Sequence, residues 1–167
     1  APAPICPGSG TQTISVAATG AGLTYSWRRN GTAVANGGVI SGQGTNTLIL
    51  SNPTAANAGS YTVVIGGACS PAATSNAVIV SLNTATAIST PAAPASQNVL
   101  LNGTPTNLSM SATGTALTYQ WYTSLVNCTN CGTGAGSGNG GQTNTYTPPT
   151  NVIGTKYYYC IATGTCG

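Results

Sequence analysis

The feature that most constrains the fold is an internal repeat. The segment SVAATGAGLTYSW at residues 15–27 matches SMSATGTALTYQW at residues 109–121, with eight identities in thirteen positions and a constant offset of 94. Further on, Thr-Asn-Thr at residues 45–47 recurs at 143–145, and the spacing of eight between Tyr61 and Cys69 recurs between Tyr158 and Cys166. A repeat of this length in a chain of 167 residues predicts two copies of one folding unit.

The segment between the two copies predicts where the domains divide. Residues 81–97, SLNTATAISTPAAPASQ, are rich in Thr, Ala and Pro. Pro91 and Pro94 favour an extended, stiff connection. We place the boundary near Ala87, which gives a first domain at residues 1–86 and a second at residues 87–167.

Large apolar residues alternate with small or polar ones in short runs within each copy. Every second residue is apolar in LTYSW at residues 23–27 and in YTVVI at residues 61–65, and Gly, Asn and Pro separate such runs. A period of two over five to seven residues is typical of half-buried antiparallel strands. The fold class is therefore expected to be all-β.

Two aromatic positions in each copy indicate the kind of β fold. A Trp that ends an early strand, followed later by Gly-x-Tyr opening another strand, is typical of an immunoglobulin-like sandwich. We expect Trp27 and Trp121 to fill the space between two sheets. The hydroxyls of Tyr61 and Tyr158 are expected to bond to nearby backbone and form a corner. The chain should thus form two tandem immunoglobulin-like β-sandwich domains.

The second domain is expected to lack its last strand within this chain. SNAVIVSL at residues 75–82 supplies that strand in the first copy, and adding the later offset of 97 (158 minus 61) gives positions 172–179, beyond Gly167. The strand at residues 158–161 would then have an unpaired edge. Two alternatives remain open: the natural chain continues, or a neighbouring subunit donates the strand as in strand-complemented filaments.

Residues 30–70 and 145–167 resemble the immunoglobulin-like repeats of very large secreted bacterial surface proteins, which include gliding-motility adhesins and other cargo of the type IX secretion pathway. The sequence departs from that family at the corner motif, where Asn57 in Asn-Ala-Gly-Ser-Tyr takes the place of the usual Asp. The resemblance implies an extracellular location on the bacterial cell surface. It specifies the module well and the function poorly, because such modules serve as spacers, adhesins and enzyme appendages.

The composition argues against several function classes. The chain has no Asp, Glu or His, and its only charged side chains are Arg28, Arg29 and Lys156. It therefore lacks the usual groups for acid–base catalysis and an oxygen cage for Ca²⁺ or Mg²⁺, so we expect no enzyme, no cofactor and no metal. The net charge of +3 forms no basic patch for nucleic acid. No apolar run is long enough for a membrane span.

Six cysteines are expected to form structural disulfides in an oxidising compartment. The sandwich expected for the first copy places Cys6 and Cys69 at the same pole, so we expect these two to pair. In the second copy Leu100 takes the place of Cys6, which leaves Cys166 without that partner.

Four cysteines then remain in the second copy, and they allow three connectivities. Distance favours local pairing, Cys128 with Cys131 and Cys160 with Cys166. Cys-x-x-Cys at residues 128–131, with a second cysteine pair elsewhere, is also typical of zinc sites and of redox-active sites. The two pairs are expected to lie far apart, which argues against a shared zinc ion.

One exposed aromatic patch is expected on the second copy. If Trp121 and Tyr158 point inward, then Tyr122, Tyr157 and Tyr159 point outward from neighbouring strands. The leading hypothesis is a non-catalytic structural or adhesive segment of an extracellular repeat protein or fibre, with neighbouring immunoglobulin-like repeats or subunits as partners. The alternatives are a carbohydrate-binding accessory module of a secreted enzyme, with surface glycans bound at the patch, and a strand-complemented filament subunit.

Overall fold

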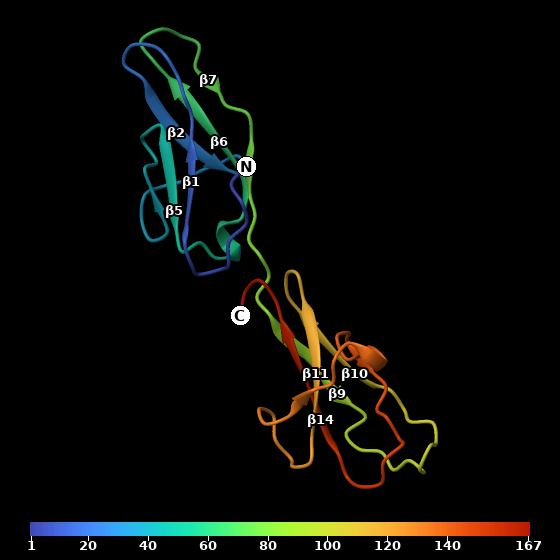
Figure 1. Cartoon of the computed structure of the whole chain (residues 1–167). Coiled ribbons are helices and arrows are strands. Elements are labelled where there is room, and N and C mark those ends of the chain that lie inside the picture. Colours follow the sequence, from blue (N-terminus) through green and yellow to red (C-terminus); the bar gives the residue numbers. More distant parts are fainter. The chain divides into compact units, whose positions relative to one another are not determined.

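The computed structural model describes all residues 1–167 and divides them into two compact units, Ala1–Asn83 (unit 1) and Thr84–Gly167 (unit 2). Each unit is built almost entirely from short antiparallel strands, which Figure 1 colours from blue to green in unit 1 and from green to red in unit 2. The expected fold class is confirmed: the chain forms two tandem immunoglobulin-like β-sandwiches. No helix is long and apolar enough to cross a membrane.

Unit 1 consists of two facing sheets. One sheet has the strand order β1-β5-β4, and the other has the order β3-β2-β6-β7, with β8 also paired to β6. The alternation of buried and exposed residues along β1 and β5 follows the period of two seen in the sequence. The elements are β1 (Thr11–Ser15), β2 (Thr24–Arg29), β3 (Thr32–Ala33), β4 (Ile40–Ser41), β5 (Thr47–Ser51), the 3-10 helix η1 (Ala55–Asn57), β6 (Gly59–Gly66), β7 (Ala73–Thr74) and β8 (Val78–Val80).

The core of unit 1 forms around Trp27, which is 2% exposed. Apolar side chains from both sheets surround it, and its indole Nε1 donates a hydrogen bond of 2.8 Å to the Thr45 carbonyl. The hydrogen bond satisfies the one polar atom of the buried ring, so burial of the indole costs little. The core consists of Ile14, Trp27, Leu48, Leu50, Tyr61, Val63 and Val80.

The Thr-Asn-Thr repeat builds the same turn in both units. In unit 1 the Thr45 hydroxyl donates to the carbonyls of Gly42 (3.0 Å) and Thr47 (2.8 Å). In unit 2 Thr143 makes the same two bonds, to Gly140 at 3.1 Å and to Thr145 at 2.6 Å. Both turns present a threonine carbonyl to the tryptophan of their own unit, so the repeated sequence places the core indole in both sandwiches.

The corner motif of unit 1 takes the expected form. The Tyr61 hydroxyl donates a 2.6 Å hydrogen bond to the carbonyl of Asn57, the last residue of η1. Gly59 lies at φ +147, and a Cβ there would come within 2.8 Å of the Asn30 side-chain oxygen. That same oxygen accepts a hydrogen bond from the Ser60 backbone N–H, so only glycine leaves room for this link between the start of β6 and the turn after β2.

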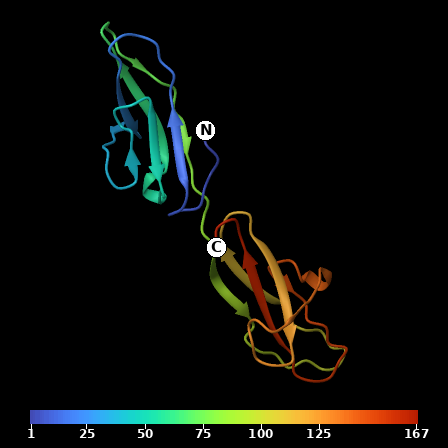
Figure 2. The same cartoon turned by 60° about the vertical axis from the view of Figure 1, so that its left-hand side comes forward.

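Unit 2 also has two sheets, with the orders β13-β10-β9 and β12-β11-β14. Figure 2 shows β14, in red, running beside β11, in orange. Within this chain β14 pairs only with β11, so its other edge carries no strand. The elements are β9 (Ala87–Ala93), β10 (Leu108–Thr113), β11 (Thr118–Ser124), β12 (Thr133–Gly134), the 3-10 helix η2 (Gly138–Gly140), β13 (Thr145–Tyr146) and β14 (Tyr157–Thr163).

The interpretation of residues 81–97 as a connection was wrong for its central part. Residues 87–93 form β9, which pairs with β10 inside unit 2. The pairing shifts register between Ser109 and Ser111, opposite the stretch that holds Pro91. A proline has no N–H to donate and is tolerated in a strand at such an irregularity, so its presence did not exclude a strand here.

The core of unit 2 repeats the tryptophan arrangement with fewer buried partners. Trp121 is 0% exposed, and its Nε1 donates a 2.9 Å hydrogen bond to the Thr143 carbonyl. Its ring stacks on Tyr146 with centroids 5.9 Å apart. Leu108 and Met110 complete the buried cluster. Both tryptophans are therefore sealed between sheets, as the sequence predicts.

The corner expected at Tyr158 does not form. Unit 2 has no helix directly before β14, because η2 lies much earlier in the chain. No helix therefore presents a carbonyl to this hydroxyl, as η1 presents that of Asn57 in unit 1. The Tyr158 hydroxyl interacts with Thr123 instead. The same tyrosine position thus has different partners in the two units.

Candidate functional site

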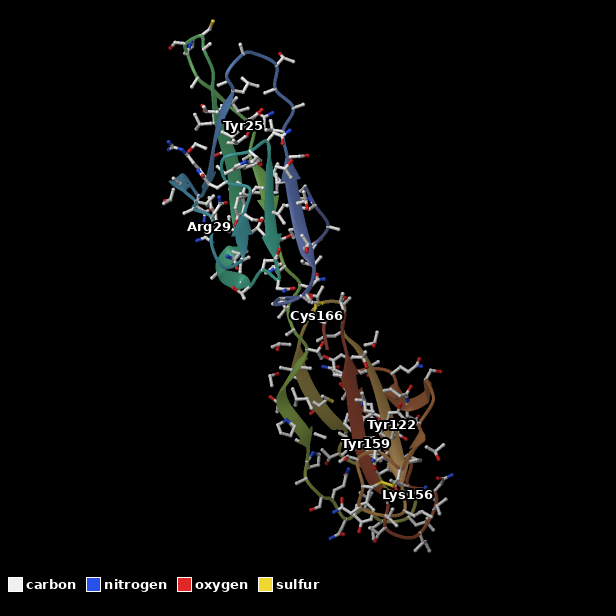
Figure 3. The ribbon with its side chains drawn as sticks, turned by 90° about the vertical axis from the view of Figure 1, so that its left-hand side faces the viewer. Tyr25, Arg29, Tyr122, Lys156, Tyr159 and Cys166 are labelled. Atoms are coloured by element: carbon white, nitrogen blue, oxygen red, sulfur yellow. A yellow bond between two sulfur atoms is a disulfide. The ribbon has the colours of Figure 1, made fainter.

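Two of the three tyrosines predicted as a patch lie together. Tyr122 on β11 and Tyr159 on β14 are register partners, and their rings stack with centroids 5.0 Å apart and planes 6° apart. Figure 3 shows the two side chains next to each other on neighbouring strands. Because directly opposite residues of an antiparallel pair project to the same face, the sheet itself brings the rings together. One face of each ring is used in this contact.

The loop between β11 and β12 packs against this pair. The Tyr159 hydroxyl accepts a 3.0 Å hydrogen bond from the Gly132 backbone N–H. A Cβ on Gly132 would come within 2.9 Å of the Tyr159 ring, so the loop approaches the ring as closely as a glycine allows. The stacked pair is therefore partly covered, and neither ring lies open on the sheet as a sugar-stacking platform requires.

Tyr157 does not join the stacked pair. It is 38% exposed and pairs in register with Ser124, whereas the ring contacts of unit 2 involve other tyrosines and Trp121. Tyr157 is thus the most exposed of the three tyrosines.

The expected disulfide between Cys128 and Cys131 is confirmed. The Cα atoms lie 6.0 Å apart, and the bond closes the loop between β11 and β12. A redox-active Cys-x-x-Cys is activated by an electropositive setting such as a helix N-terminus, whereas this one sits between two strands. No group of three or more Cys, His, Asp or Glu side chains is placed to hold a metal ion. The geometry fits a structural cross-link.

The expected bridge between Cys6 and Cys69 is wrong. Cys69 is an exposed free thiol, whereas Cys6 is disulfide-bonded. The chain just after Cys6 bonds to the Pro53 carbonyl at one pole of unit 1. Ala68, next to Cys69, bonds to the Ala21 carbonyl at the other pole. The five residues of β1 separate these poles by roughly 17 Å, well beyond the reach of a disulfide.

The expected bridge between Cys160 and Cys166 is also wrong. Cys166 is disulfide-bonded and buried, but Cys160 is a free, half-buried thiol. The chain stays extended from Cys160 to Thr163 at the end of β14, so these two residues lie about 10 Å apart. Cys166 follows beyond that end, which puts it out of disulfide reach of Cys160. Cys160 lies opposite Trp121 in register and packs against the core. Burial raises the pKa of its thiol to about 11, so the group stays protonated at neutral pH and reacts slowly with alkylating reagents.

The two arginines and the lysine do not gather into a charged site. Arg28 donates to the Gly31 carbonyl at 3.4 Å, and Arg29 donates to the Ala56 carbonyl in η1. Both guanidinium groups therefore bind backbone of their own unit. Lys156 lies in unit 2, just before β14.

A groove in unit 2 was not foreseen from the sequence. It has a volume of about 690 Å³, and two of its walls are residues 94–99 and residues 152–159. The buried Leu108 and residues 127–129 of the loop after β11 also line it. Residues 94–97 of the first wall belong to the stretch 81–97 that the sequence predicts to be an extended connection. The repeat offset of 94, which relates Ile5 to Val99, is the signal that relates this wall to the N-terminal segment of unit 1.

The chain matches no known sequence family and no curated protein. Among solved structures it is similar to the I-band fragment I67–I69 of titin, with a TM-score of 0.59 and 13% identity, over 96% of this chain and 61% of that one. An E-to-A variant of titin I67–I69 gives a TM-score of 0.54 and 17% identity, over 71% of this chain and 42% of that one. The amphioxus IgVJ-C2 molecule gives 0.53 and 12% identity, over 95% and 98%. At these identities the likeness establishes the immunoglobulin-like fold.

Proposed function

We propose that this chain is a non-catalytic structural and adhesive segment of an extracellular repeat protein at a bacterial cell surface. The observation that carries the proposal is the duplication, in a single chain, of one sandwich built around a buried tryptophan. Both units bury a tryptophan almost completely and tie its indole to the same Thr-Asn-Thr turn. Tandem copies of one module suit a spacer, whose length grows with the number of copies.

Two further observations support the location and the role. The Cys128–Cys131 disulfide closes a surface loop, and such bonds persist mainly in oxidising, extracellular compartments. The surface carries only three charged side chains, so neighbouring copies repel one another little and can lie side by side. Neighbouring immunoglobulin-like repeats or subunits are the proposed partners.

The mechanical part of the proposal is tested by pulling single molecules from their two ends in the presence of a reductant. Each unit of 83 or 84 residues should unfold in its own force peak and release roughly 30 nm of chain. The Trp121→Ala variant should lose one of the two peaks. Extension without force peaks would contradict a load-bearing role.

Location and ligand require separate measurements. Antibodies against the chain should label intact cells that produce it, and protease added outside those cells should remove the label. On a glycan array the chain should bind no sugar, because the Tyr122 and Tyr159 rings stack on each other. Sugar binding that Tyr157→Ala abolishes would replace the proposal with the carbohydrate-binding alternative.

A further inference from the structure

The last strand of unit 1 lies in a slot with two walls. On one side β8 pairs antiparallel with β6, with Val80 opposite Gly59 and Val78 opposite Tyr61. On the other side the chain just after β8 forms a parallel bridge between Leu82 and Ile5. Val80 is 1% exposed, and Val78 packs against the core. Two alternate valines therefore close this side of the sandwich.

Unit 2 has the same two walls. β14 corresponds to β6 at the offset of 97, and Val99 corresponds to Ile5 at the offset of 94. A second pair of hydrogen bonds supports this correspondence: Gly8 donates to Pro53 in unit 1, and Asn102 donates to Thr150 in unit 2. The groove of about 690 Å³ lies between these two walls, where β8 lies in unit 1.

The groove opens onto the core of unit 2. Leu108 and Tyr158, which belong to or pack against the buried cluster, both line it. Tyr61 and Val63 are 0% exposed in unit 1, whereas their counterparts Tyr158 and Cys160 are only half-buried. Unit 2 therefore leaves apolar core surface uncovered along the β14 edge, beside a row of unpaired backbone groups.

We propose that this groove binds an extended polypeptide strand that is supplied from outside residues 1–167 and carries branched apolar residues at alternate positions. The strand pairs antiparallel with β14, and its backbone satisfies the unpaired groups of that edge. By the register of β8 on β6, its first and third apolar residues lie opposite Tyr158 and Lys156. Their side chains enter the groove and cover the core, as Val78 and Val80 do in unit 1.

Strand chemistry fits this groove better than the chemistry of other occupants. A sugar or a lipid would cover apolar surface and leave the backbone groups of β14 unpaired. A second copy of the chain would have to withdraw β8 from its own unit 1 to supply this strand, because β8 already pairs with β6 there. Edge-to-edge pairing of β14 between two copies would give a dimer, and the test below detects it. The inference concerns the binding chemistry of unit 2 alone and does not depend on the proposed cell-surface role.

The probe is a peptide with the sequence of residues 75–82, SNAVIVSL, flanked by lysines for solubility. The control peptide carries serine in place of the valines that correspond to Val78 and Val80. Binding to the full chain is measured by calorimetry, and occupancy of unit 2 by the alkylation rate of Cys160 in the Cys69→Ser variant. Since Cys160 belongs to unit 2, its protection distinguishes this groove from exchange of β8 in unit 1.

We expect saturable binding of the valine peptide, at least tenfold weaker binding of the serine peptide, and several-fold slower alkylation of Cys160. Val99→Glu, which places a charge in the groove, should weaken binding tenfold or more. Leu125→Glu, at an exposed site outside the groove, should leave binding unchanged. Equal binding of both peptides, absence of binding, or a dimer that the valine peptide does not dissociate would overturn the proposal.

Discussion

Unit 1 and unit 2 share one sequence repeat and one tryptophan anchor, yet they differ in how completely the sandwich is closed. In unit 1, β8 lies along β6 and Val80 seals the core, so Tyr61 is fully buried. In unit 2 the corresponding edge of β14 is open and Tyr158 stays half-buried. The tryptophan and its turn thus specify where the sheets face each other, whereas the last strand decides whether the core is closed.

The largest expected effect comes from the two tryptophans. Trp121→Ala should destabilise unit 2 by about 4 kcal/mol, because truncation removes a fully buried side chain and leaves a cavity. Trp27→Ala should cost unit 1 a similar amount. Unit 2 has fewer buried side chains, so we expect it to unfold outright, while unit 1 keeps a measurable transition. Urea unfolding followed by far-ultraviolet circular dichroism, which reports on both units, measures both losses, and the fluorescence of the remaining tryptophan shows that the unaltered unit is unchanged. An unchanged midpoint of the altered unit would contradict the role of its indole.

A glycine in the repeated turn should matter equally in the two units. A Cβ on Gly42 would lie 2.1 Å from the Thr47 carbonyl oxygen, and one on Gly140 would lie 2.2 Å from that of Thr145. Each residue also has a positive φ near 80°. Gly42→Ala and Gly140→Ala should each destabilise their unit by about 2 kcal/mol. Gly44→Ala, where a Cβ meets nothing within 4 Å, is the matched control and should be nearly neutral. Unequal effects at the two sites would show that the turns are not equivalent.

The corner hydroxyl should distinguish the units by a smaller amount. Tyr61→Phe removes the 2.6 Å hydrogen bond to the Asn57 carbonyl and should cost about 1 kcal/mol. Tyr158→Phe has no such corner bond to lose and should cost less than half as much. Thermal unfolding of both variants measures the difference, and an equal loss would mean that the Tyr158 hydroxyl has a corner partner after all.

The smallest effect is a difference in alkaline stability. In unit 2, burial raises the pKa of Tyr146, Tyr158 and Cys160. In unit 1, burial raises the pKa of Tyr61, and the positive charge of Arg29 partly opposes that rise. A raised folded-state pKa contributes stability that is fully present below the unfolded pKa and is lost as pH rises through the folded value. Unit 2 should therefore lose more stability than unit 1 above about pH 9.

The thiol part of this loss can be isolated. Cys160 should lose its contribution between pH 9 and its folded pKa of about 11. Cys160→Val, which copies the Val63 position of unit 1, should remove that part of the pH dependence. From pH 5 to 7 the stability of both units should be flat, since the chain has no Asp, Glu or His to titrate. A marked slope there would contradict the account.

The sequence predicted the parts of the fold that depend on local periodicity and on the repeat. The alternation around Trp27 and Trp121 located the central strands, and the offset between copies located the open edge at β14. The predicted patch was only partly realised: the sheet register brings Tyr122 and Tyr159 together, but the disulfide-closed loop packs against the Tyr159 ring, and residue spacing gave no sign of that contact.

The errors concern long-range geometry. The predicted bridge between Cys6 and Cys69 assumed that the chain before β1 lies at the same end of unit 1 as Cys69. Residue spacing does not show at which end of the sandwich that segment lies. The strand β9 was missed because Pro91 favours an extended connection as well as an irregular strand, and only pairing with β10 decides between them. The groove wall at residues 94–99 was missed for the same reason.

Amide hydrogen exchange, measured residue by residue on the intact chain, tests the difference between a closed and an open sandwich most directly. β6 pairs with β2 on one edge and with β8 and β7 on the other, and the Val63 N–H between them donates to the Ser75 hydroxyl, so its amides from Tyr61 to Ile65 should all exchange slowly. Along β14 slow and fast exchange should alternate, because only the amides directed at β11 have partners. Uniformly slow exchange along β14 would mean that its second edge is already covered, and the distinction between the two units would then be lost.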